Sequence, residues 1–325
     1  MPLPVTARHL ALFPPNWIGD AVLAQPAMRA IVRHFNSRQV SVFGRPWLKD
    51  LLTWLDLPNA SFHPEPPRDA DIVFLFPNSF RSAWQAKNAG IDRRVGFRGQ
   101  WRRFLLTDAP RPRINLKNEH HRDYYLDLPG QMGIATDERE VRLQAPAGAV
   151  EAGRLLLEEH GLEPERTICV APGAQFGGAK RYPAEAYAHV LAWLAERGWQ
   201  FVILGTSAEQ TAGELCLHKI TGSAWNATGR TTLQQALQLV SAARLLLTND
   251  SGLMHVAAGL HKPTVALFGA TDPARTSPSG ARVRILYEPA PCSPCLEREC
   301  SVSGHPCMGN ILPEAVRDAC LEMLA

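Results

Sequence analysis

The most informative segment of this chain is Thr248-Asn249-Asp250-Ser251-Gly252-Leu253-Met254-His255-Val256-Ala257-Ala258. It lies between two apolar runs, Leu245–Leu247 and Thr264–Phe268, so the pattern predicts a strand, a sharp turn, a helix and a second strand. One face of the expected helix is apolar with the i, i+3, i+4, i+7 spacing of an amphipathic helix, at Leu253, Val256, Ala257 and Leu260.

A helix that begins directly after a strand offers a ready site for an anion. Asn249 and Asp250 are good N-cap residues, so we expect the helix to begin near Ser251. The first amides of a helix have no intrahelical partner and lie at the positive end of its dipole. Gly252 lets a ligand approach the backbone, and Asp250 and His255 flank it. The segment is typical of a diphosphate site, although an ordinary capped core helix fits the same residues equally well.

The alternation of strands and helices predicts an α/β protein with parallel sheets that carry helices on both faces. Predicted strands are His9–Phe13, Gln39–Phe43, Asp71–Phe76, Thr167–Val170, Gln200–Leu204, Leu245–Thr248 and Thr264–Phe268. Predicted helices include Trp47–Leu55, Ala184–Arg197, Thr232–Ala243 and Pro313–Leu324. The rhythm restarts after residues 145–165, so we expect two domains, residues 1–155 and 156–325, facing each other across a small-molecule cleft.

Composition excludes several classes of protein. The chain has 325 residues, of which 46% are hydrophobic and 20% charged, as in ordinary globular proteins. No apolar run approaches the roughly 20 residues of a membrane span, and residues 1–12 do not form a signal peptide. We therefore expect a cytoplasmic protein. A net charge of +3 does not suggest a nucleic-acid partner.

Basic residues are concentrated in one segment. Between Arg93 and Arg113 there are seven arginines and a single acid, Asp108. Because arginine makes bidentate contacts with phosphate, this run favours phosphorylated ligands or an anionic membrane surface over a merely solvated face.

Four of the seven cysteines are grouped near the C-terminus, at Cys292, Cys295, Cys300 and Cys307. In a cytosolic chain such a group indicates metal or redox chemistry more than disulfides. The spacing matches no standard zinc signature, so a structural metal and a loop of reduced thiols both remain open. Cys169, Cys216 and Cys320 are predicted to be buried core thiols.

Other candidate residues lie in loops that follow predicted strands, where open α/β sheets bind ligands. Asp20 ends the first such loop and is either a helix cap or a general base. Residues 172–183 contain three glycines, Lys180 and Arg181, a composition that suits a diphosphate but lacks the Walker A order. Glu209 follows a third strand and is either a solvent-facing acid or an acceptor for nucleotide hydroxyl or amine groups.

Four motifs in order resemble the ADP-heptose:lipopolysaccharide heptosyltransferases, a family of bacterial glycosyltransferases with the GT-B fold. The resemblance covers nearly the whole chain and is closest to the type II enzymes. It rests on Asn16-Trp17-Ile18-Gly19-Asp20, on Phe76–Ser82 with Gly96–Gly99, on Pro172–Pro183 and on Thr248–Ala258.

The resemblance implies inverting transfer of L-glycero-D-manno-heptose from ADP-heptose to a heptose of the Kdo–lipid A core, at the cytoplasmic surface of the inner membrane and without a required cofactor. Related enzymes that act on earlier or later core sugars (heptosyltransferase I or a later core enzyme) share these motifs, so the acceptor position stays open. The implied catalytic residues are Asp20 as base and Lys180. Implied donor contacts are Gln175, Phe176, Lys180, Glu209, Asp250, Ser251, Gly252 and His255, and implied acceptor contacts are Asn16, Trp17, Asn78, Arg81, Arg98 and Arg102. No metal ligand is implied, because the cysteine segment is not shared by every member.

Two other classes of protein are less compatible with the sequence. A nucleotide-sugar epimerase or dehydrogenase needs a G-x-G-x-x-G turn after the first strand, where this chain has Pro14-Pro15-Asn16-Trp17-Ile18-Gly19-Asp20. A non-enzymatic zinc module built on the four cysteines would leave the three strand-end loops unexplained.

Overall fold

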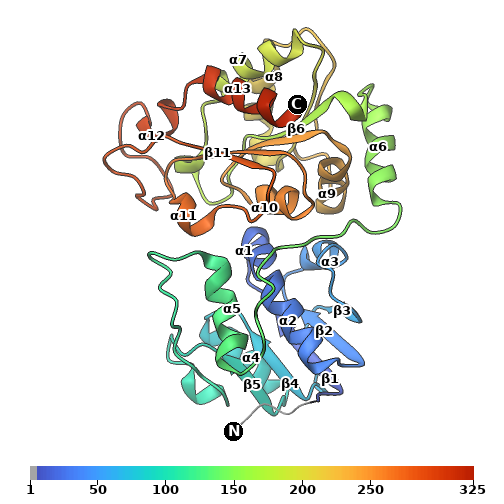
Figure 1. Ribbon diagram of the computed structural model, residues 1–325, viewed down its shortest axis with the longest axis vertical. Coiled ribbons are helices and arrows are strands. Elements are labelled where there is room, and N and C mark those ends of the chain that lie inside the picture. The colour runs from blue at the N-terminus through green and yellow to red at the C-terminus, as the bar shows by residue number, and fades with distance from the viewer. Residues whose placement is uncertain (1–5) are drawn as a thin grey trace. The chain divides into compact units, whose positions relative to one another are not determined.

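A computed structural model describes residues 6–325 and divides the chain into two compact units, Met1–Gln144 and Ala145–Ala325. The two units are coloured blue to green and green to red in Figure 1. The boundary expected at residues 155 and 156 lies inside helix α6 (Ala149–Glu159), eleven residues beyond this division. Among the described residues, no helix is long and apolar enough to cross a membrane.

The first unit is a five-stranded parallel sheet in the order β3-β2-β1-β4-β5. Its elements are β1 His9–Phe13, α1 Ile18–Leu23, α2 Gln25–Phe35, β2 Gln39–Phe43, α3 Leu48–Leu52, β3 Ala60–His63, β4 Ile72–Leu75, α4 Phe80–Asn88, β5 Arg93–Gly96, the 3-10 helix η1 Arg103–Leu105 and α5 His121–Gln131. β1 pairs with both β2 and β4, so the chain reverses its direction of travel across the sheet at this point.

The second unit is a six-stranded sheet in the order β11-β10-β9-β6-β7-β8, again with parallel pairs throughout. Besides α6 it contains η2 Pro164–Arg166, β6 Thr167–Ala171, η3 Gly178–Lys180, α7 Ala184–Ala195, β7 Gln200–Ile203, η4 Ser207–Glu209, α8 Gln210–Leu217, β8 Ala224–Asn226, α9 Leu233–Ala242, β9 Leu245–Asn249, α10 Gly252–Gly259, β10 Thr264–Phe268, α11 Pro273–Thr276, β11 Val283–Tyr287, α12 Pro306–Gly309 and α13 Pro313–Leu324. The predicted parallel α/β architecture is confirmed in both units.

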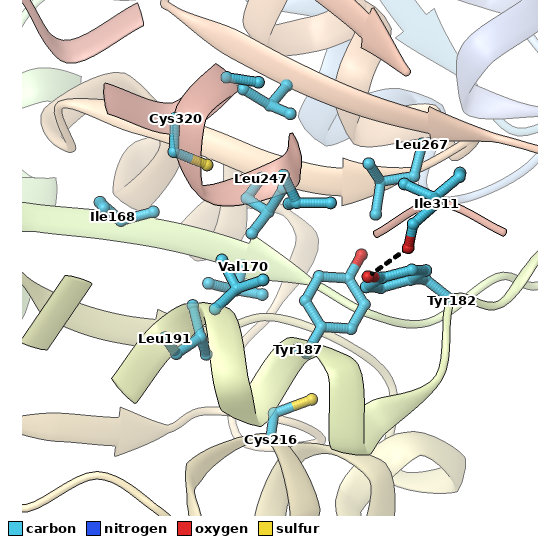
Figure 2. Packing of buried hydrophobic residues seen from close by; sticks show 14 of the residues in the cluster. Ile168, Val170, Tyr182, Tyr187, Leu191, Cys216, Leu247, Leu267, Ile311 and Cys320 are labelled. Atoms are coloured by element: carbon cyan, nitrogen blue, oxygen red, sulfur yellow. Dashed lines mark hydrogen bonds between the residues drawn. The ribbon is translucent and has the colours of Figure 1, made fainter. Parts of the chain in front are cut away.

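Both faces of the second sheet are buried, because neighbouring residues of a strand point to opposite faces. On one face, side chains such as Val170 and Leu247 pack against residues of α7, α8 and α13. On the other, Cys169 and Leu246 pack against residues of α6, α9 and α10. Figure 2 shows the first of these layers, with the buried thiols of Cys216 and Cys320 and the hydroxyl of Tyr182, which donates to the Ile311 carbonyl at 2.9 Å. The predicted burial of Cys169, Cys216 and Cys320 is confirmed.

The helical segment after β1 is divided into two helices, α1 and α2. The break is at Ala24, and Pro26 occupies the first turn of α2, where its missing amide costs no hydrogen bond. Asp20 lies in α1, the first helix after β1.

Candidate active site

In the second unit, the loops after four neighbouring strands converge on one edge of the sheet. β6 and β9 are adjacent but lead in opposite directions, to β7 and to β10, so a topological switch point lies between their carboxyl ends. The loop 172–183 leaves β6, and the turn into α10 leaves β9. This is the position at which open parallel sheets bind nucleotides.

Lys180 and Asp250 form the charged centre of this edge. The Lys180 ammonium lies 2.6 Å from an Asp250 carboxylate oxygen, and both side chains are largely buried, with exposures of 14% and 7%. The Thr271 hydroxyl donates to the same oxygen at 2.5 Å. Thr271 follows β10 and was not anticipated from the sequence. Lys180 is thus held by the carboxylate beside the first turn of α10, where its charge adds to that of the helix dipole.

The turn into α10 differs from the expectation in one respect. Ser251, rather than Asn249 or Asp250, is the N-cap residue, in extended conformation. Asn249 belongs to β9 and is buried, where it accepts from the Tyr187 hydroxyl at 2.9 Å and donates to the Pro172 carbonyl at 2.5 Å. Asn249 therefore anchors the β6 loop to β9, which leaves the amides of Gly252 and the following residue at the open end of α10.

Glu209 is buried rather than solvent-facing, with 8% of its surface exposed. One of its carboxylate oxygens accepts from the Thr206 amide at 2.7 Å, closing a capping box around η4. A Cβ on Gly173 would come within 1.6 Å of the other carboxylate oxygen. The carboxylate therefore lies directly against the backbone of the β6 loop, and its position depends on a glycine there.

The remaining donor candidates differ in accessibility. Gln175 is exposed, Phe176, Ser251 and Gly252 are partly buried, and His255 is buried as the fourth residue of α10. Two cations lie near the Phe176 ring, whose centroid is 4.9 Å from the Lys180 ammonium and 5.4 Å from the Arg298 guanidinium.

The cysteine segment packs on the β6 loop. The Ala179 amide donates to the Arg298 carbonyl at 2.9 Å, the Gly178 amide donates to a Glu299 carboxylate oxygen at 3.1 Å, and the His305 ring is hydrogen-bonded to the Ala179 carbonyl at 2.9 Å. A Cβ on Gly177 would come within 2.1 Å of the Arg298 carbonyl oxygen. Arg298 and Glu299 were not identified from the sequence, since nothing in the spacing linked them to a loop over 100 positions earlier.

The four cysteines of this segment are reduced and differ in exposure, from the exposed Cys292 to the buried Cys307. Burial raises the pKa of the Cys307 thiol, and the three neighbouring cysteines raise it further. Within residues 6–325, no three histidine, cysteine or carboxylate side chains are placed to hold one metal ion.

In the first unit, Asp20 lies in the first turn of α1, whose N-cap residue is Trp17. The Tyr125 hydroxyl donates to an Asp20 carboxylate oxygen at 2.9 Å, and the His121 Nδ1 lies 3.5 Å from the same oxygen. Burial raises the pKa of Tyr125 well above its usual range, and the charge of Asp20 raises it further, so the tyrosine keeps its proton. Among the described residues, the buried Nε2 of His121 has no hydrogen-bond partner. Both α5 residues were missed by the sequence analysis.

The predicted acceptor residues fall into two groups. Asn16, Trp17 and Arg81 are exposed and Arg98 is partly buried, so they are accessible. Arg102, in contrast, is fully buried: it donates to the Phe97 carbonyl at 2.9 Å, to the Pro77 carbonyl and to the Asn78 side-chain oxygen at 3.1 Å. Burial lowers the pKa of Arg102 to about 10, which still leaves it charged at neutral pH.

Asn78 also donates to the Tyr124 hydroxyl, so Arg102 and Asn78 both brace the loop after β4. We therefore leave Arg102 out of the proposed acceptor contacts. Arg93 and Arg94 are likewise engaged: Arg93 is bidentate to Asp108 at 3.0 and 3.1 Å, and Arg94 donates to the Leu105 carbonyl at 2.7 Å. Fewer of the seven arginines between Arg93 and Arg113 are therefore accessible to a ligand than we expected from the sequence.

Two parallel α/β units with ligand loops at their strand ends are compatible with a glycosyltransferase. The chain belongs to glycosyltransferase family 9 (heptosyltransferase), whose model matches residues 67–305. A Salmonella typhimurium protein named lipopolysaccharide heptosyltransferase 2 is 31% identical over 301 residues, which cover 84% of this chain and 86% of that protein. The Escherichia coli K12 protein of the same name is equally similar, at 31% identity over 301 residues. The solved structure of E. coli ADP-heptose lps heptosyltransferase II matches with a TM-score of 0.81 and 28% identity, over 97% of this chain and 98% of that one. The expected GT-B fold and family are thereby confirmed.

Proposed function

We propose that this protein transfers L-glycero-D-manno-heptose from ADP-heptose to a heptose of the lipopolysaccharide inner core, as a type II heptosyltransferase. The observation that supports this most directly is the meeting of Lys180, Asp250 and the first turn of α10 at the switch point of the second sheet. The names of the most similar relatives favour this acceptor over that of heptosyltransferase I or of a later core enzyme.

In the proposed mechanism, the second unit holds the donor. The ADP diphosphate binds at the α10 N-terminus, at Ser251 and Gly252, with Lys180 as counter-ion, and Glu209 accepts from a ribose hydroxyl or the adenine amine. Gln175, Phe176 and His255 complete this donor site. As the bond to the anomeric carbon breaks, negative charge grows on the diphosphate, and fixed donors aimed at it lower the barrier. These groups take the role of a divalent cation, so we expect transfer to need no metal.

The first unit supplies the base and the acceptor contacts. Asp20 takes the proton of the acceptor hydroxyl as its oxygen attacks the anomeric carbon, which inverts the configuration there. Tyr125, held protonated beside it, keeps the carboxylate oriented. Asn16, Trp17, Arg81 and Arg98 are the proposed acceptor contacts, and Asn78 positions the loop that carries them. The acceptor is lipid-linked, so we propose action at the cytoplasmic face of the inner membrane.

The acceptor is tested by supplying ADP-heptose, in the presence of EDTA, with purified Kdo–lipid A cores that carry no heptose, one heptose or two. Product from the one-heptose core alone is expected. Product only from the heptose-free core would identify a type I enzyme, and product only from the two-heptose core a later one. Activity that appears only after zinc is added would overturn the metal-free mechanism.

The base is tested by Asp20→Asn, which we expect to lower kcat by roughly 10² to 10⁴ while ADP-heptose still binds, the range that general-base catalysis typically supplies. Tyr125→Phe is a matched variant that keeps the carboxylate and removes one hydrogen bond, so its effect should be far smaller. A loss of less than tenfold in Asp20→Asn would show that Asp20 is not the base.

The cysteine segment holds the β6 loop through its backbone and through Glu299 and His305. We propose that its role is to order the donor loop and that its thiols need no metal to do so. Elemental analysis of the purified protein checks this. One metal per chain that is lost in Cys292→Ser and Cys295→Ser, together with donor affinity, would show instead that Cys292, Cys295, Cys300 and Cys307 form a structural metal site.

A further inference from the structure

Large aromatic side chains are exposed on one part of the first unit. Trp101 is 91% exposed and Phe104 68%, and on α4 Phe80 is 42% and Trp84 48% exposed. The Phe80 and Phe104 rings lie 6.0 Å apart, so α4 and η1 present their aromatics together. Trp84 follows Phe80 by one helical turn and hence lies on the same face of α4. Grouped apolar surface of this kind marks an interaction site.

The same region is cationic. An open hollow of about 540 Å³ beside Trp101 and Phe104 is lined by Arg98 and Arg103. Helix α4 has the sequence FRSAWQAKN, with two cations and no acid. Within residues 6–325, none of Arg81, Lys87, Arg98 and Arg103 forms an ion pair. The charges of Arg81, Lys87 and Arg103 are therefore available to an anionic partner. Arg98 donates its Nε to the Ala109 carbonyl at 3.0 Å, and it has no carboxylate partner among the described residues.

Trp101 is exposed on a loop whose backbone adopts an unfavourable conformation. Gln100 and Trp101 both have left-handed backbone angles, with φ of 45° and 59°. That region is unfavourable for a bulky residue, and such strain persists where the surroundings enforce it. Here the enforcing contact is Arg102, whose amide donates to the Gly99 carbonyl at 3.0 Å and whose buried guanidinium fixes the loop. Because the buried side chain of Arg102 fixes this loop, the neighbouring side chains of Trp101 and Arg103 are held at the surface.

We propose that this surface docks on an anionic lipid bilayer, with the aromatic rings at the headgroup level and the arginines on lipid phosphates. Aromatic residues favour the membrane interface, and exposed basic residues are attracted to anionic leaflets. A second copy of this chain is a poorer occupant, since a two-fold contact would place the arginines of both copies against each other. We call this the docking surface, defined by Phe80, Trp84, Arg98, Trp101, Arg103 and Phe104.

This inference rests on the proposed function only for the reason to approach a membrane, and its test needs no substrate. The full-length protein is sedimented with phosphatidylcholine vesicles, with and without phosphatidylglycerol. Binding is expected with the anionic vesicles, weaker at high salt, and reduced by about tenfold or more in Trp101→Ser/Phe104→Ser and in Arg103→Glu. Leu312→Ser, which removes a side chain that is 62% exposed in the second unit, is the matched control and should bind like the wild type.

The depth at which Trp101 enters the bilayer is measured by the quenching of tryptophan fluorescence with brominated lipids. Quenching is expected in the wild type and should fall in Trp101→Phe, which keeps an aromatic ring and hence the binding. Unchanged vesicle binding in Trp101→Ser/Phe104→Ser would overturn the proposal. So would a concentration-dependent dimer that this variant abolishes in the absence of lipid.

The two proposals can fail separately. With a deacylated core as acceptor, Trp101→Ser/Phe104→Ser should transfer heptose like the wild type. If this variant lost transfer activity with the deacylated core as well as vesicle binding, the surface would bind acceptor sugar rather than lipid. Absence of transfer by the wild type with every core would refute the proposed function and leave the vesicle result standing.

Discussion

Glu209 shows how one glycine can position a proposed nucleotide contact. Its carboxylate lies against Gly173, at a place that any Cβ would occupy, and is held from the other side by Thr206. The sequence offered only an acid after a strand, with a solvent-facing position as the simpler interpretation. Burial of a carboxylate that accepts from a backbone amide and a hydroxyl indicates a positioned group instead.

Gly173→Ala is expected to weaken ADP binding by about tenfold, because the new methyl group must displace the Glu209 carboxylate. Isothermal titration with ADP measures this. Gly222→Ala is the control, since a Cβ there meets no atom within 4 Å. In a background of Glu209→Ala, the clash is gone and Gly173→Ala should cost little more, a non-additivity typical of residues in contact. Additive losses would mean that the two residues act independently.

The arginines in β5 and in the segment between β5 and α5 show that one residue type can have different roles within a short segment. Arg93 and Arg94 hold main chain and Asp108, Arg102 is buried beneath the docking surface, and Arg103 is exposed on it. Composition alone predicted a single anion-binding cluster. A buried arginine is rare without partners. Besides the nearby Phe97 carbonyl, Arg102 has partners at Pro77 and Asn78 in the loop after β4, more than 20 positions earlier.

At the scale of elements, the ion pair of Arg93 with Asp108 links strand β5 to the segment that follows η1. Asp108 pairs through its backbone with β5, and its carboxylate accepts from Arg93 and from Thr107. Burial acts to raise the pKa of Asp108, but the hydrogen bonds from Arg93 and Thr107 outweigh it and hold the pKa below its usual range. A carboxyl group with a lowered pKa stabilises the folded state at neutral pH, and this contribution is lost as the pH falls through the folded-state pKa.

Asp108→Asn should therefore lower the free energy of unfolding of the first unit by about 1.5–3 kcal/mol at pH 7. The difference from the wild type should shrink as the pH falls below about 4, near the usual pKa of aspartate. Urea unfolding followed at the two pH values measures both. Asp92→Asn, on an exposed neighbour that forms no ion pair within residues 6–325, should change little at either pH. A deficit that persists undiminished at acid pH would show that the charge of Asp108 is not what matters.

Elements with a clear apolar period were predictable from the sequence, and those without one were not. α13 has the expected bounds, and β1, β2 and β10 match as well, because their apolar runs are long relative to the element. β5 was missed since it reads Arg-Arg-Val-Gly, and α5 since it contains Pro129 and Gly130. The strand-end loops were predictable because parallel sheets gather them at one edge. The contact of Tyr125 with Asp20 joins positions 105 apart and leaves no local pattern.

At the scale of the whole molecule, each unit has its own sheet and its own buried core, so each is expected to unfold as a separate cooperative unit. The proposed function places the whole donor site on the second unit. A ligand stabilises only the unit that binds it, by about 2.7 kcal/mol when its free concentration is 100 times Kd.

Scanning calorimetry of the intact chain tests this division. Ile72→Ala and Leu247→Ala each remove a fully buried side chain, from the first and the second core, and should each lower one transition and so assign it. Saturating ADP is expected to raise the transition that Leu247→Ala lowers and to leave the other in place. Lys180→Ala should abolish that rise. It should also lower the same transition in the absence of ADP, because it leaves the largely buried Asp250 carboxylate without its ion-pair partner. If ADP raised the transition assigned by Ile72→Ala instead, the donor would bind the first unit, and the roles proposed for Asp20 and Lys180 would both have to be withdrawn.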